Sequence, residues 1–219
     1  MWNWFHAIRS RSKQKVAARW LAPSENPWGL AVLDCTQFAC TMISFTDSIE
    51  IARKFDNLRS STGEELRNEI FNPTLSIACS LAYKISKRAP DGPIFKSRVM
   101  EEKWDIYLYD DHFYFCRSWG GELFYRAAMQ CEPPTLRVLG VETGQKNDEK
   151  TALRNVDFLV KSHVLLAKAL HPLPRELGRD TQKLAVSSFS AYGRIGLYGT
   201  FEETIGTPYY WDRALSDRP

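Results

Sequence analysis

Residues 103–141, KWDIYLYDDHFYFCRSWGGELFYRAAMQCEPPTLRVLGV, contain the pattern that decides the fold class. Runs rich in aromatic and β-branched residues alternate with turn sequences, which predicts consecutive strands. The predicted strands are 104–109, 112–119, 122–129 and 135–141. Asp110-Asp111 and Gly120-Gly121 are expected to form two-residue turns, and connections this short join antiparallel neighbours. The stretch therefore predicts an antiparallel β-meander.

Two-residue turns would fix the register of the strands and divide their side chains between two faces. The apolar face would carry Trp104, Ile106, Leu108, Phe113, Phe115, Phe124 and Ala128. The other face would be rich in tyrosine, with Tyr107, Tyr109, Tyr114, Tyr125 and also His112. Two interpretations of this tyrosine-rich face stay open. Either the N-terminal third of the chain covers it, or it is an exposed recognition surface.

The segments outside the meander predict mainly helices. Apolar residues repeat at alternating three and four positions over residues 148–170, which predicts a helix with one apolar side that covers the sheet. Residues 2–21 predict a basic N-terminal helix, and Asp47 followed by Glu50 resembles the capping box of another helix. Residues 75–85 fit a strand or a buried helix, and residues 183–201 are expected to form two strands.

These elements together predict an α+β fold. A meander of about four to six antiparallel strands would pack against helices, principally helix 148–170. The 219 residues suit a single domain spanning 1–219, with an aromatic C-terminal tail over residues 206–219.

Composition narrows the classes of function and the compartment. The formal net charge is only +3, whereas a dedicated nucleic-acid-binding domain usually carries a strong basic stripe. The five cysteines are dispersed and form no CxxC pair, which favours reduced thiols and a cytoplasmic location. No apolar run approaches the roughly 20 residues that a membrane span needs, so no span is expected.

The sequence offers no strong catalytic or metal-binding motif. Cys116 and His112 lie four residues apart on one predicted strand, about 13 Å at the usual rise, which is too far for a nucleophile and its base. None of the four histidines has the spacing of a zinc site. The sequence therefore predicts no metal and no cofactor, and a packed thiol at Cys116.

The leading hypothesis is a non-enzymatic protein-binding module that neutralises a cellular partner, as immunity proteins do, or scaffolds one. Its expected binding residues are Tyr107, Tyr109, His112, Tyr114 and Tyr125, with Arg9, Lys13 and Arg19 as a second patch for an acidic partner. One alternative is a hydrolase or transferase that uses His112 with a distant carboxylate. Another is a nucleic-acid-associated protein that uses the basic N-terminal helix.

Overall fold

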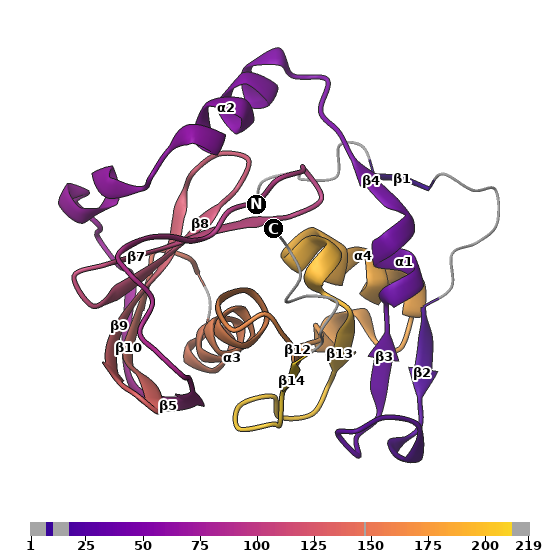
Figure 1. Cartoon of the computed structure of the whole chain (residues 1–219). Coiled ribbons are helices and arrows are strands. Elements are labelled where there is room, and N and C mark those ends of the chain that lie inside the picture. Colours follow the sequence, from indigo (N-terminus) through magenta and orange to yellow (C-terminus); the bar gives the residue numbers. More distant parts are fainter. Residues whose placement is uncertain (1–7, 11–17, 147, 212–219) are drawn as a thin grey trace.

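The computed structural model describes residues 8–10, 18–146 and 148–211, and its largest element is a six-stranded sheet (Figure 1). The strand order is β5-β10-β9-β8-β7-β6, and every neighbouring pair is antiparallel. The strands are β5 (Leu75–Lys84), β6 (Gly92–Phe95), β7 (Trp104–Tyr109), β8 (His112–Arg117), β9 (Leu123–Glu132) and β10 (Thr135–Thr143). The predicted α+β fold with an antiparallel meander is confirmed, and the ambiguous segment 75–85 contains a strand.

Helix α3 (Glu149–Leu159) covers the apolar face of this sheet. Asp148 caps it by accepting the backbone N–H of Thr151, and Val156 and Phe158 are fully buried against the sheet. The predicted helix 148–170 is too long. After a π-helical turn (Val160–Val164) the helix ends, and Leu166 takes a positive φ of 53°.

The chain after α3 forms two short strands, β11 (Ala167–Lys168) and β12 (Leu170–Pro172). Ala167 and Leu170 stay buried in these strands. The apolar repeat therefore continued past the end of the helix, and this continuation made the predicted helix too long.

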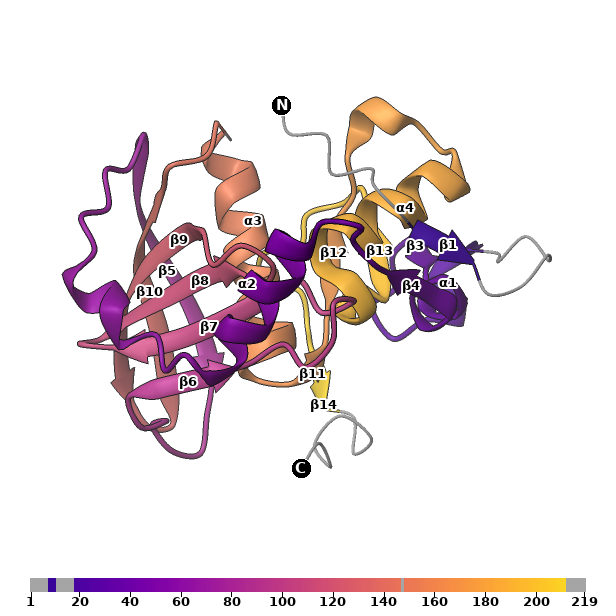
Figure 2. The ribbon, with the colours of Figure 1, turned by 90° about the horizontal axis from the view of Figure 1, so that it is seen from above.

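A second sheet lies beside the first, in the order β12-β13-β3-β2 (Figure 2). Its other strands are β2 (Arg19–Leu21), β3 (Val32–Asp34) and β13 (Tyr198–Thr200). Helices α1 (Thr36–Thr41) and α4 (Thr181–Tyr192) pack on it through Phe38, Leu184 and Phe189. Two-stranded pairings join β1 (Ile8–Ser10) to β4 (Met42–Ser44), and β11 to β14 (Tyr210–Trp211).

Two predictions of secondary structure are wrong in this second layer. The first half of segment 183–201 is helix α4, because Asp180 caps it and its buried residues recur at helical spacing. The N-terminal segment 2–21 is extended wherever the structure describes it. Residues 8–10 and 19–21 are strands that pair with neighbours later in the chain, and residues 1–7 and 11–17 lie outside the described residues.

Residues 45–71, called the strap below, cross the face of the large sheet opposite α3 (Figure 1). The strap contains α2 (Ile49–Ser60) and a 3₁₀ turn (Glu64–Asn68). Ser48, rather than the predicted Asp47, caps α2, because its hydroxyl accepts the N–H of Ile51. None of the helices within residues 18–146 and 148–211 combines the length and the hydrophobicity that crossing a bilayer requires.

Candidate functional site

The strap buries the tyrosine-rich face, so the covered interpretation is the correct one. Tyr107, Tyr109 and Tyr114 are 3%, 8% and 5% exposed and pack against Leu66 of the strap. The Tyr109 hydroxyl donates to the carbonyl of Thr62 at 2.9 Å. These tyrosines therefore hold two layers of the same chain together and are not available as an open recognition surface.

A buried charged network fixes the strap to the sheet. Asp105, which is 1% exposed, accepts hydrogen bonds from Arg59 of α2 at 2.8 Å and from the backbone N–H of Ser97 at 2.8 Å. Lys96 Nζ lies 3.4 Å from the same carboxylate and donates to the Tyr107 hydroxyl at 2.6 Å. Burial lowers the pKa of Lys96, and Asp105 opposes that shift. Asp105 is the buried charge of the network, whereas Arg59 and Lys96 are partly exposed, so removing a cation would leave the buried carboxylate less compensated.

Tyr125 lies on the opposite face from the one predicted. The first hairpin has the predicted register, with Phe115 opposite Ile106, but in the second hairpin Phe115 faces Tyr125 and not Arg126. The Arg117 N–H bonds to the Glu122 carbonyl, so the turn holds four residues between them and not Gly-Gly alone. Tyr125 consequently packs in the core beneath α3 and accepts a hydrogen bond from Asn155 at 3.0 Å.

The remaining predicted binding residues do not form one site. His112 is half-buried at the β7–β8 hairpin, and its Nδ1 lies 2.7 Å from the carbonyl oxygen of Asp110. Arg9 lies in β1, and Lys13 lies outside the described residues. Arg19 lies in β2, where its exposed side chain is 3.7 Å from Glu25. The structure places the two arginines in different sheets.

Cys116 is a packed thiol, as the sequence predicts. It is 2% exposed on β8, and burial strongly raises its pKa, which keeps the sulfur protonated and poorly nucleophilic. Within the described part of the chain, no group of three or more His, Cys, Asp or Glu side chains is arranged to hold a metal ion.

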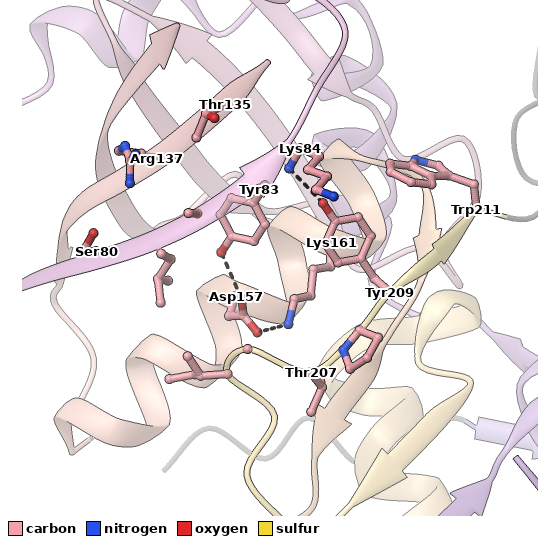
Figure 3. Close-up of a pocket in the computed structure, with 15 residues that line it drawn as sticks. Ser80, Tyr83, Lys84, Thr135, Arg137, Asp157, Lys161, Thr207, Tyr209 and Trp211 are labelled. Carbon is pink, nitrogen blue, oxygen red and sulfur yellow. Dashed lines mark hydrogen bonds and ion pairs between the residues drawn. The ribbon is translucent and has the colours of Figure 1, made fainter. Parts of the chain in front are cut away.

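The candidate site is a groove of about 650 Å³ beside β5, at the edge of the six-stranded sheet (Figure 3). Strands β5 and β10, helix α3 and the segment 205–211 form its walls. Its polar and aromatic lining residues are Ser80, Tyr83, Lys84, Thr135, Arg137, Asp157, Lys161, Thr207, Tyr209 and Trp211. A groove of this size can take several residues of a peptide or one small molecule.

Three buried polar side chains form the floor of the groove. Lys161 Nζ lies 2.6 Å from Asp157, and the Tyr83 hydroxyl donates to the same carboxylate at 3.0 Å (Figure 3). The π-helical turn directs Lys161 so that it also donates to the carbonyl of Thr204 at 3.1 Å. Burial raises the pKa of Asp157, while Lys161 acts in the opposite direction. The floor is thus an internally paired cluster.

The rim of the groove is the outer edge of β5. The N–H of Ile85 bonds to Pro134 on the β10 side, whereas the N–H of Lys84 points away and donates to the Tyr209 hydroxyl at 2.9 Å. Since successive N–H groups of a strand point to opposite sides, the N–H of Ala82 also points to the open edge. No partner for it is recorded among the residues that the structure describes.

Edge strands in proteins are commonly protected by charges, prolines, bulges or short length. β5 is ten residues long, LSIACSLAYK, and its only charged residue is Lys84. One bulge is present, because pairing passes from Leu81–Val138 to Ala78–Gly140. The C-terminal side of this bulge, residues 80–84, is the part that borders the groove.

Sequence reasoning missed this groove, although two of its parts had signals. The apolar, almost uncharged run 75–85 was ambiguous between strand and helix, and the aromatic tail had no assigned place. The structure docks the described part of that tail, residues 206–211, on its own chain, with Tyr210 opposite Lys168 in the β11–β14 pairing. Comparison with models of known protein families, with curated proteins and with solved structures found no match.

Proposed function

We propose that this chain is a protein-binding module that takes an extended segment of a partner protein along the open edge of β5. The observation that carries the proposal is the almost uncharged edge of β5, which Tyr209 caps at Lys84 and which no described residue bonds at Ala82, beside a groove of about 650 Å³. Addition of a strand to an exposed sheet edge is a recurrent mode of peptide recognition, in which main-chain hydrogen bonds supply affinity and flanking pockets supply specificity.

The dimensions of the edge set the length of the bound segment. Residues 80–84 border the groove, and at about 3.3 Å per residue they span roughly 17 Å. A segment of about five residues fits this length. Its alternate side chains would point to the two sides of the sheet, one set toward the floor at Tyr83 and the other toward the solvent-exposed face that carries Ala82.

A proline in place of Ala82 tests the proposal. Ala82→Pro removes the N–H on the open edge and leaves the bonds to β10 in place, which is where a strand tolerates proline. Ala82→Thr keeps the N–H and is the matched control. The tagged protein and both variants would be incubated with host lysate at physiological salt, and co-purifying proteins identified.

We expect a stoichiometric partner with the wild type and with Ala82→Thr, and its loss with Ala82→Pro at an unchanged melting temperature. A partner that binds Ala82→Pro as strongly as the wild type would refute edge binding. Absence of any partner from the wild-type sample would refute the protein-binding module itself.

A further inference from the structure

The solvent-exposed side of the groove is positively charged. Of the four charged residues in its lining, Lys84, Arg137 and Lys161 are cationic and only Asp157 is anionic. Asp157 is already paired with Lys161 in the floor, at 2.6 Å. Lys84 and Arg137 are exposed, and neither takes part in an ion pair among the residues that the structure describes. The groove therefore has two cations available to a ligand.

Both cations lie on the same face of the sheet. Arg137 of β10 is directly opposite Ala82 of β5, and Lys84 is two residues further along β5, so all three side chains point to the side away from the floor. Ala82 lies between Arg137 and the open edge, and its side chain is only a methyl group. A strand added at that edge would run about 10 Å from β10, a gap that an arginine and a glutamate side chain can bridge together.

We infer that the partner segment is acidic, with Asp or Glu at alternate positions on the face that carries Lys84 and Arg137. This inference rests on the proposed edge binding and adds the chemistry of the ligand. The acidic residues are the two outward ones nearest the side chains of Arg137 and Lys84, and the Lys84 N–H itself stays bonded to Tyr209. The inward residue between them faces Tyr83 and the paired floor, so it is uncharged.

The probe for this inference is a displayed library of random heptapeptides, selected against the full chain. Three versions of the protein are used for selection: the wild type, the charge reversal Lys84→Glu with Arg137→Glu, and a control reversal Arg53→Glu with Lys54→Glu. The selected peptides are also tested for binding to Ala82→Pro. Arg53 and Lys54 are exposed on α2, outside the groove lining, so the control changes net charge equally. The selected peptides are sequenced, and the strongest is measured by fluorescence anisotropy.

We expect Asp or Glu at two positions separated by one residue in peptides selected by the wild type and by the control. The groove reversal should select Lys or Arg at those positions and should weaken the best acidic peptide by about tenfold or more, the sum of two exposed ion pairs turned into repulsions. Raising salt should weaken the wild-type complex as well, since exposed charge pairs are screened.

The outcomes separate this inference from the proposed function. Selected peptides that require the Ala82 N–H but have the same charge with all three proteins would overturn the acidic ligand and leave edge binding standing. Peptides that bind Ala82→Pro as well as the wild type, or no selected peptides at all, would overturn edge binding and the acidic ligand with it.

Discussion

Protonation of His171 should make the stability of this protein fall in acid. The residue lies on β12 and is completely buried, with the rings of Phe158 and Tyr192 at 5.4 Å and 5.0 Å. Its Nδ1 lies 3.2 Å from the carbonyl oxygen of Pro172. Because burial disfavours the charged imidazolium, the pKa of His171 falls from 6.5 to about 4.

The sign and size of the effect follow from the two pKa values. In the unfolded chain the imidazole takes a proton below about 6.5, whereas in the folded protein it does so only below about 4. The stability that the neutral His171 imidazole contributes is therefore fully present above pH 6.5 and is lost as the pH falls to 4. The difference of about 2.5 between the two pKa values corresponds to about 3 kcal/mol of unfolding free energy.

Urea unfolding followed by tryptophan fluorescence at pH 7.5, 6.5, 5.5 and 4.5 would measure this loss. His171→Asn removes the titrating group and keeps a side-chain N–H donor. The variant should be less stable than the wild type at pH 7.5, because the contacts of the imidazole ring are lost. Its unfolding free energy should fall less steeply with acid than that of the wild type. Parallel pH profiles for the two proteins would refute the assignment of the acid sensitivity to His171.

Three further predictions test other parts of the structure by urea unfolding. Asp105→Asn leaves two partly buried cations, Arg59 and Lys96, without their carboxylate and should cost about 3 kcal/mol, the lower end for a buried ion pair, so an unchanged midpoint would contradict the network's role. Gly63→Ala should destabilise the folded protein, because φ is +77° and the new Cβ would lie 2.3 Å from the Tyr107 ring. The control Gly29→Ala, where φ is +66° and the space is open, should lower the unfolding free energy less. Equal losses in the two variants would show that the contact with Tyr107 is unimportant. Burial lowers the pKa of Lys103 from 10.5 to about 7, so wild-type stability should rise between pH 7 and 9.5, and Lys103→Met should flatten that rise.

The fold class could be predicted because its evidence is local. The strands of residues 104–117 are separated by Asp110-Asp111, and both aspartates take positive φ values of 48° and 57° in the structure. That turn fixes the first hairpin's register, which was predicted correctly. The second turn could not be predicted with equal success, since Gly120-Gly121 lies within a longer loop. The shift moved Tyr125 to the other face of the sheet.

Helix and strand predictions failed in two segments whose local hydrophobic pattern does not indicate their secondary structure. α4 was mistaken for strands because Ser187, Ser188 and Ser190 interrupt a simple apolar stripe and glycines follow it. The N-terminal strands are only three residues long and are defined by pairing with residues far along the chain, such as Arg19 with Asp34. A three-residue strand carries almost no periodic signal of its own.

The candidate groove was beyond the reach of sequence reasoning for a different reason. Its walls come from four segments around residues 80–84, 135–137, 157–161 and 205–211, and only the tertiary fold brings them together. The exposed cations Lys84 and Arg137 are 53 positions apart in the chain. Lys84 and Arg137 therefore come together only through the β5–β10 register.

The abundance of tyrosine has an explanation other than binding to a partner protein. A buried tyrosine needs a partner for its hydroxyl, and the boundary between two layers supplies one. Tyr109 bonds to the strap, Tyr125 to α3 and Tyr83 to Asp157 of α3. Aromatic richness therefore cannot distinguish an interface with a partner from an interface within the chain. Recognition along an edge uses backbone groups and leaves little side-chain signature, so the experiment must remove a backbone N–H, as Ala82→Pro does.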